Sequence, residues 1–155
     1  MYSLGCFYHA SSHGLPQDYT KALELWHRAA ELGYAAAYTN IGVFYNCGIG
    51  VEIDEKKANH CWELAAIQGS VMARYNLGNN ERKAGNFDRA VKHYMIAAQD
   101  GKADSLKKIE QFYLNGHATK NVYTAALRSY QEYLIEIKSR QRDEAVTLNN
   151  QFRYY

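Results

Sequence analysis

Residues 41–69 read IGVFYNCGIGVEIDEKKANHCWELAAIQG, and this stretch decides the fold because most of its pattern recurs along the chain. Its opening pair Ile41-Gly42 returns as Leu4-Gly5 and as Leu77-Gly78, 37 residues earlier and 36 residues later. A fixed period in this size range is typical of proteins that stack small, similar units. A weaker fourth copy uses Ile109, Tyr113, Gly116, Ala126 and Tyr130.

The second half of each copy has the apolar spacing of an amphipathic helix. Ala58, Cys61, Trp62, Ala65 and Ala66 fall at i, i+3, i+4, i+7 and i+8, so they share one helix face. The segments 22–30 and 90–98 repeat this phase. We expect these helices to begin after N-cap residues and to end at left-handed glycines; the expected caps are Asp18, Asp54 and Asn86, and the glycines are Gly33, Gly69 and Gly101.

The first half of each copy predicts a partner helix, over residues 2–11, 34–46, 70–84 and 102–115. A glycine in mid-helix costs about 1 kcal/mol relative to alanine, so its recurrence needs a physical reason. We expect close approach of the partner helix, with an Ala-Ala pair opposite each glycine. Large side chains then fill the gaps between repeats, which gives a repeat core of Gly5, Trp26, Gly42, Tyr45, Trp62, Gly78 and Tyr94.

The stretch from Ile41 to Gly69, with Lys57-Ala58 in place, matches LGxxYxxGxGVxxDxxKAxxWxxxAAxxG and resembles the Sel1-like repeat (SLR), a relative of the tetratricopeptide (TPR) repeat. The resemblance covers about residues 2–137. It implies an all-α fold: a right-handed superhelix, or solenoid, of about four helix-turn-helix repeats with a concave groove and a long C-terminal capping helix. We expect one repeat domain over 1–146, with repeats at about 1–33, 34–69, 70–101 and 102–137, and an aromatic tail at 147–155.

Three departures from the motif modify this expectation. The third repeat lacks the Gly-x-Gly-Val loop, and residues 83–86 join its helices directly. In the fourth, Glu110 replaces the glycine and Tyr133-Leu134 replaces Ala-Ala, so we expect looser packing with larger residues in the space. The first repeat begins late, which suggests a fragment or an open-ended domain. We expect the tail residues Phe152, Tyr154 and Tyr155 to pack back onto the last helices.

Composition restricts the function classes. No apolar run is long enough to span a bilayer. Three cysteines without a close pair favour a reducing compartment, so we expect a cytoplasmic or nuclear location. The net charge of +2 is too small to predict nucleic-acid binding. Charge is uneven, since residues 1–69 are acidic overall and residues 70–116 are basic.

No catalytic or cofactor motif is found in the sequence. The pair Gly48-x-Gly50 forms a turn in the repeat, because no strand precedes it and no lysine follows at phosphate-loop spacing. Cys6, His9 and His13 have helical spacing, but the helix is expected to end near Ser11, so we predict no metal site. We therefore expect a protein that is not an enzyme and has no cofactor and no catalytic residues.

By the TPR resemblance, the first helices line the groove that binds a partner. The positions carried over on this resemblance are rich in amides and, further along, in basic side chains. Asparagine can both donate to and accept from a peptide backbone, and Lys and Arg pair with carboxylates. A solvated helix face is the alternative interpretation. The predicted partner-binding residues are Asn40, Asn46, Tyr75, Asn76, Asn79, Arg82, Lys83, Lys107, Lys108, Gln111 and Asn115.

The sequence leaves two classes of function open. The first is a non-catalytic adaptor or scaffold whose groove binds a peptide or protein partner, with an acidic segment favoured by the basic residues. The second is a structural element that stacks through its open N-terminal repeat on another chain or domain, including self-association. Nucleic-acid binding would need a continuous basic stripe with stacking aromatics, and most tyrosines fall on core positions.

Overall fold

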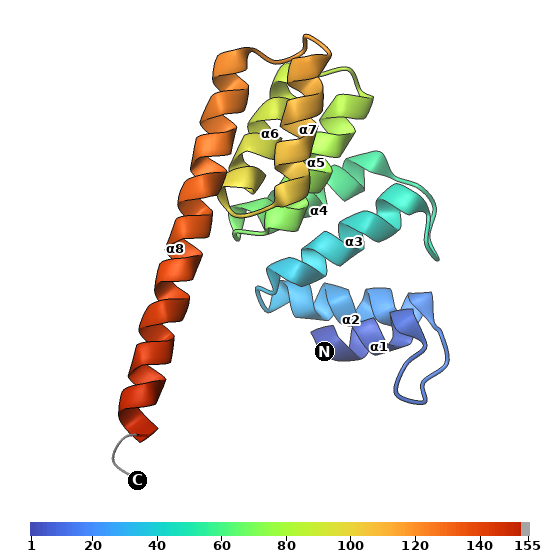
Figure 1. Cartoon of the computed structure of the whole chain (residues 1–155). Coiled ribbons are helices and arrows are strands. Elements are labelled where there is room, and N and C mark those ends of the chain that lie inside the picture. The colour runs from blue at the N-terminus through green and yellow to red at the C-terminus, as the bar shows by residue number, and fades with distance from the viewer. Residues whose placement is uncertain (153–155) are drawn as a thin grey trace. The chain divides into compact units, whose positions relative to one another are not determined.

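The computed structural model describes residues 1–152, with side chains for all of these except 145, 146 and 148–152, and every regular element in that range is an α-helix (Figure 1). This confirms the all-α class. The helices are α1 (Tyr2–Ala10), α2 (Tyr19–Glu31), α3 (Ala35–Cys47), α4 (Glu55–Ile67), α5 (Val71–Lys83), α6 (Phe87–Gln99), α7 (Ala103–Leu114) and α8 (Lys120–Phe152). The tail residues Tyr154 and Tyr155 lie outside the described residues, as does the side chain of Phe152.

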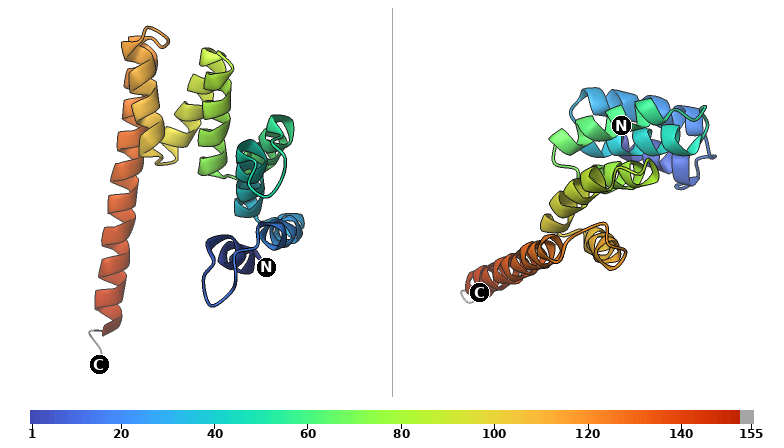
Figure 2. Two further views of the ribbon diagram at one scale, coloured as in Figure 1. Left: turned by 90° about the vertical axis from the view of Figure 1, so that its right-hand side faces the viewer. Right: turned by 90° about the horizontal axis from the view of Figure 1, so that it is seen from above.

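The chain forms two compact units. The N-terminal unit, Met1–Asn86, contains α1 to α5, and the C-terminal unit contains α6 to α8 from Phe87 onward. The predicted repeat domain, 1–146, spans both units. In the N-terminal unit each helix packs against the next one, so that α1 and α2 lie side by side, as do α3 and α4 (Figure 2).

Five helices end in the same hydrogen-bonded turn. After α2, the Tyr34 amide donates to the Ala29 carbonyl at 3.2 Å and the Gly33 amide donates to the Ala30 carbonyl at 2.9 Å. This Schellman pattern needs a left-handed residue, and Gly33 supplies it with a φ of 86°. The same pair of bonds recurs around Gly69, Gly85, Gly101 and Gly116, so the predicted glycine ends are confirmed.

The predicted N-caps Asp18 and Asp54 have the expected geometry. The carboxylate of Asp18 accepts from the Lys21 amide at 2.8 Å, and that of Asp54 accepts from the Lys57 amide at 3.0 Å. These bonds satisfy amides that have no partner within the helix. Asn86, the third predicted cap, donates its side-chain amide to the Glu81 carboxylate at 2.8 Å.

Two of the mid-helix glycines, Gly5 and Gly42, make room for an indole ring, which corrects the predicted reason for their recurrence. A Cβ on Gly5 would lie 2.6 Å from Nε1 of Trp26, and one on Gly42 would lie 2.6 Å from Cδ1 of Trp62. We had expected Ala-Ala pairs opposite these glycines. The close approach is real, but the group that approaches is the tryptophan of the second helix, because only a missing side chain leaves space for a flat ring against the backbone.

Each indole also makes the same hydrogen bond. Trp62 donates Nε1 to the Thr39 carbonyl at 3.0 Å, and Trp26 donates Nε1 to the Tyr2 carbonyl at 3.3 Å. Both acceptors lie three residues before the glycine that faces the ring. Since a buried N–H without a partner is costly, this bond allows both tryptophans to be only 2% exposed.

Packing between successive repeats is edge to face, and it recurs in both units. Phe44 of α3 meets Trp26 of α2 at 5.0 Å between ring centroids and 85° between planes. In the C-terminal unit, Phe112 of α7 meets Tyr94 of α6 at 5.8 Å and 78°. The predicted role of large residues between repeats is therefore correct for Trp26 and Tyr94. Tyr45 differs from the other predicted core residues, because it is only half-buried, with the Lys57 ammonium 5.2 Å from its ring centroid.

In the C-terminal unit α6, α7 and α8 pack against one another, and α8 continues well beyond its two neighbours (Figure 1). The missing glycine of the fourth repeat leaves Glu110 exposed, where its carboxylate accepts from the Tyr123 hydroxyl at 3.3 Å. The rings of Tyr113 and Tyr123 stack at 5.5 Å with only 6° between planes. Larger side chains thus join α7 to α8 at the place of the glycine–indole contact.

We predict that Gly42→Ala lowers the free energy of unfolding by about 1–2 kcal/mol, because the clash with Trp62 outweighs the gain in helix propensity. The matched control is Trp62→Phe, whose smaller ring lacks the indole Nε1 that comes nearest to the position of the new methyl group. In that background the same substitution should cost less than about 0.5 kcal/mol. Urea unfolding of the two single variants and the double variant measures the coupling, and additive effects would contradict the contact.

We predict that the stabilisation by Asp54 depends on pH. Its hydrogen bond from the Lys57 amide, and secondarily the Lys57 charge, lower the pKa of the carboxyl group. Because the folded pKa is depressed, the contribution is fully present above the unfolded pKa of about 4 and is lost as pH falls through the folded value. The difference in urea midpoint between Asp54→Ala and the parent should therefore shrink from pH 7 to pH 3. Glu63→Gln, at an exposed position on the same helix, should show no such trend.

Candidate partner-binding surface

The predicted groove residues of the N-terminal unit lie on α3 and α5. Of these, Asn40, Asn46, Tyr75, Asn76 and Asn79 are half-buried, while Arg82 and Lys83 are exposed at the end of α5. Partial burial places a polar group at the surface with restricted motion, which is the condition that a binding residue needs.

Adjacent first helices are joined by polar contacts at this surface. The Asn40 side-chain amide lies 3.5 Å from the Tyr2 hydroxyl, so α3 contacts α1 through these two side chains. The pKa of the Tyr2 hydroxyl is raised, mainly by burial and then by Cys6 beside it. Asn40 therefore contacts Tyr2 within the protein, in addition to its predicted role in binding a partner.

An asparagine cluster connects α3, α4 and α5. The Asn80 side-chain amide donates to the amide oxygen of Asn46 at 3.3 Å and to that of Asn59 at 3.0 Å. The oxygen of Asn46, which we expected to be available to a ligand, is thus engaged within the protein. One amide hydrogen of Asn46 points to Cys47, whose sulfur lies 3.7 Å from the nitrogen.

Sequence analysis missed Asn80 and Asn59, although a signal was present. Asn80 stands 36 residues after Phe44 and 32 before Phe112, where the second and fourth repeats have a buried aromatic ring. Asn59 stands 36 residues after Leu23, which packs against the core of the N-terminal unit. When polar residues replace apolar ones at two positions that face each other, a polar contact between the two helices is indicated.

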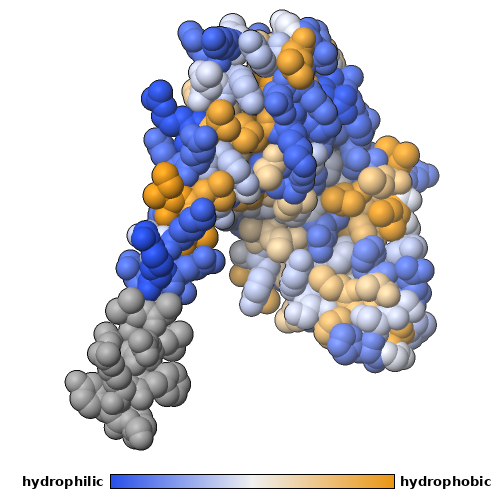
Figure 3. Space-filling model, in the orientation of Figure 1, coloured by the Kyte–Doolittle hydropathy of each residue, from blue (hydrophilic) through white to orange (hydrophobic). Residues whose placement is uncertain are grey.

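The remaining predicted residues lie on α7 in the C-terminal unit. Lys107, Gln111 and Asn115 are exposed and Lys108 is half-buried, with its ammonium 3.5 Å from the Gln111 side-chain oxygen. Lys102 first, and then Lys107 and Lys108, lower the pKa of the Asp104 carboxyl group, so this end of α7 has positive potential. Figure 3 shows mainly hydrophilic residues over α7.

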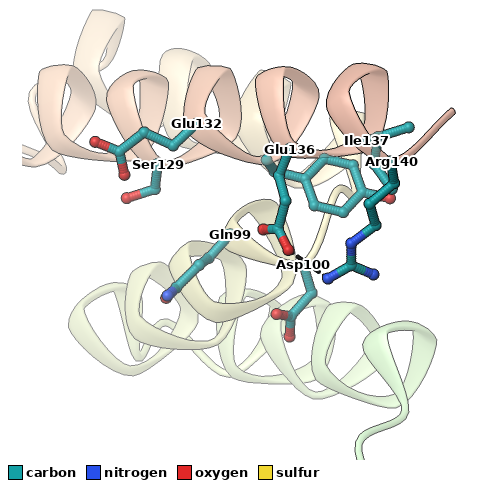
Figure 4. Close-up of a pocket in the computed structure, with 8 residues that line it drawn as sticks. Gln99, Asp100, Ser129, Glu132, Glu136, Ile137 and Arg140 are labelled. Atoms are coloured by element: carbon teal, nitrogen blue, oxygen red, sulfur yellow. Dashed lines mark hydrogen bonds and ion pairs between the residues drawn. The ribbon is translucent and has the colours of Figure 1, made fainter. Parts of the chain in front are cut away.

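A pocket of about 410 Å³ lies between the end of α6 and the middle of α8 (Figure 4). Its walls are both polar and apolar, and Figure 4 shows Glu136 beside Arg140, to which it is joined by an ion pair. Tyr133 lies against Gly101, where a Cβ would be 2.6 Å from the Tyr133 hydroxyl oxygen. The lining residues are Gln99, Asp100, Ser129, Glu132, Tyr133, Glu136, Ile137 and Arg140.

His9 and His13 of the first repeat take part in aromatic packing. His9 lies over an aromatic cluster, 5.8 Å from the Trp26 ring and 5.5 Å from the Phe44 ring, and His13 lies 4.0 Å from the Phe7 ring. Among the described residues, no three His, Cys, Asp or Glu side chains converge to hold a metal ion. Burial raises the pKa of the Cys61 thiol, which makes it a poor nucleophile, whereas Cys47 is exposed.

A family model described as the Sel1 repeat matches residues 1–34, 35–70 and 71–102. The chain belongs to the Sel1 repeat family. Sel1 repeat proteins generally mediate protein–protein interactions and generally act as non-catalytic scaffolds. Within residues 1–152, no helix is both long and apolar enough to cross a membrane.

Relatives confirm the repeat and its solenoid fold. A sel1-like repeat-containing protein of Acanthamoeba polyphaga mimivirus is 32% identical over 93 residues, which are 56% of this chain and 17% of that protein. An uncharacterized protein of Neisseria meningitidis serogroup B is 31% identical over 110 residues, covering 70% of this chain and 23% of the relative. The chain therefore spans about a fifth of the length of these curated relatives.

Two solved structures have the same architecture. A Sel1 repeat protein from Oxalobacter formigenes superposes with a TM-score of 0.67 at 25% identity, covering 90% of this chain and 57% of that one. A protective antigen of uropathogenic Escherichia coli strains, with an SLR fold, superposes with a TM-score of 0.72 at 28% identity. That match covers 84% of this chain and 29% of the antigen.

Proposed function

We propose that the protein is a non-catalytic adaptor that binds an extended segment of a partner protein along its first helices. The family to which it belongs supports the class of function, since its members generally bind proteins. The observation that supports the surface is the row of half-buried amides on α3 and α5. Free cysteines among the described residues fit our proposal of a reducing, cytoplasmic site of action.

Asparagine side chains suit a peptide backbone because each offers donors and an acceptor to groups that alternate along an extended chain. Asn76 is the residue of this row that we expect to contact the ligand most directly, since it is half-buried on α5 beside Tyr75. Asn46 has a second role, because its oxygen fixes Asn80. Loss of Asn46 would therefore disturb the surface through the cluster as well as through the ligand.

The basic residues favour an acidic ligand in this proposal. Arg82 and Lys83 are exposed at the end of α5, and Lys107 and Lys108 lower the pKa of Asp104 on α7. A carboxylate on a ligand would be stabilised by the same potential, and exposed charges at such a surface act mainly on selectivity and association rate. The predicted preference for acidic ligands should therefore change with the salt concentration.

We predict that acidic peptides bind more tightly than basic peptides of equal length, and that raising the salt concentration narrows the difference. Replacing both Lys107 and Lys108 with alanine should weaken acidic-peptide binding about 3- to 10-fold, as expected for two partly exposed charge pairs. Fluorescence anisotropy with labelled peptides measures this. Lys56→Ala, which removes an exposed lysine elsewhere, is the control. Equal affinities for both peptides, unchanged by the substitutions, would sink the acidic-ligand proposal.

A second candidate is a structural element that stacks through its first repeat. It is favoured by the apolar side chains left at the surface of the first repeat, since Met1 is 56% and Leu4 is 41% exposed. Burial of these apolar side chains against another chain would be favourable, because it removes apolar surface from water.

If the chain associates with itself through this surface, light scattering should give a mass that rises with concentration. Leu4→Lys should return the mass to that of a monomer without loss of helical content. A monomer at all concentrations up to about 1 mM, which corresponds to a very weak association, would remove self-association from consideration.

A further inference from the structure

The C-terminal unit has a second pocket, of about 460 Å³, where the α7–α8 connection crosses α6. We call it the loop niche. Its floor is apolar, with Val91 buried and Met95, Ala118 and Val122 half-buried. The rim is polar. The complete lining is Asp88, Val91, Lys92, Met95, Gly116, His117, Ala118, Thr119 and Val122.

The equivalent position in the N-terminal unit is filled by the protein's own loop. A shift of 68 residues superimposes the two sequences, so that Leu23 corresponds to Val91 and Gly48 to Gly116. After Gly48, the side chains of Ile49 and Val51 pack against the same core cluster as Leu23 does. Between them Gly50 lies so close to Tyr19 that a Cβ there would be 2.6 Å from the tyrosine Cβ.

Two substitutions in the fourth repeat leave the niche open. His117 stands where Ile49 would be, and its ring stacks on Phe87 at 4.0 Å between centroids. Thr119 stands at the place of Val51, and its hydroxyl accepts from the Val122 amide at 3.4 Å at the start of α8. Neither residue offers an aliphatic side chain to the floor formed by Val91 and Met95.

We propose that the loop niche is a docking site for an extended peptide of a partner protein that supplies two branched aliphatic side chains followed by an acidic residue. The second repeat shows the form of such an occupant, since its loop reads Gly48-Ile49-Gly50-Val51-Glu52-Ile53. The partner's two aliphatic side chains would occupy the space that the side chains of Ile49 and Val51 fill in the second repeat. This site lies apart from the amide row on α3 and α5 and is independent of it.

Charge at the rim favours the acidic residue. Lys92 lies on the niche at the position that Glu24 has in the first repeat, so the sign of the charge is reversed. Lys92 is exposed, and within the described part of the chain it forms no ion pair with a carboxylate. Asp88, one turn earlier, is the opposing charge and would disfavour a second carboxylate on that side.

The test uses the full chain and an acetylated, amidated peptide with the sequence GIGVEI, copied from residues 48–53. We expect it to shift the methyl NMR signals of Val91, Met95 and Val122, with a dissociation constant on the order of 1 mM for so short a ligand. The control peptide GAGAEI lacks the aliphatic groups and should bind at least about tenfold more weakly. The peptide GIGVKI, with lysine in place of the acid, should bind about 3-fold more weakly.

Two variants fill the niche in different ways. Ala118→Leu adds an aliphatic group to the floor, and His117→Ile restores the residue of the second repeat. Both should abolish the shifts caused by GIGVEI, while the control variant Thr124→Leu, at an exposed position on α8, should leave them unchanged. Circular dichroism checks that each variant remains helical. Because two different variants are used, the test does not depend on the folding of either one alone.

The proposal is overturned if GIGVEI and GAGAEI shift the same signals equally, or if the filled variants bind as well as the parent. It is also overturned if the methyl signals move with protein concentration in the absence of peptide, because a second copy of the chain would then be the occupant.

Discussion

The contact between a mid-helix glycine and an indole ring is the constraint on which each hairpin of the N-terminal unit depends. Gly42 has no side chain, so the Trp62 ring lies against the backbone of α3 and donates to the Thr39 carbonyl. Gly5 and Trp26 repeat this arrangement, with the Tyr2 carbonyl as the acceptor.

Trp26 also contacts the next repeat. Its edge-to-face contact with Phe44 in the N-terminal unit has a counterpart between Tyr94 and Phe112 in the C-terminal unit.

We expect function where a repeat departs from this aromatic and aliphatic packing. Asn80 replaces the aromatic and joins Asn46 to Asn59, which produces a fixed polar surface. His117 and Thr119 replace aliphatic loop residues, which leaves the loop niche open.

Helix ends were predicted well because they depend on local chemistry. The end of the second helix at Gly33 follows from the need for a left-handed residue after Glu31, and its start follows from the side-chain acceptor of Asp18. Surface roles were harder to predict. The oxygen of Asn46 is engaged by Asn80, 34 residues away, and no pattern along one helix indicates such a partner.

The sequence by itself determined the repeat, the helix boundaries and the family, because period, caps and glycine ends are properties of neighbouring residues. It also indicated that the partner helix must approach Gly42 closely. Only the tertiary structure decided that the approaching group is the Trp62 ring, that Asn59 and Asn80 meet, and that the α7–α8 connection leaves a niche over Val91. These features depend on side chains brought together from distant parts of the chain, whose sizes and hydrogen bonds are matched only after the helices have packed.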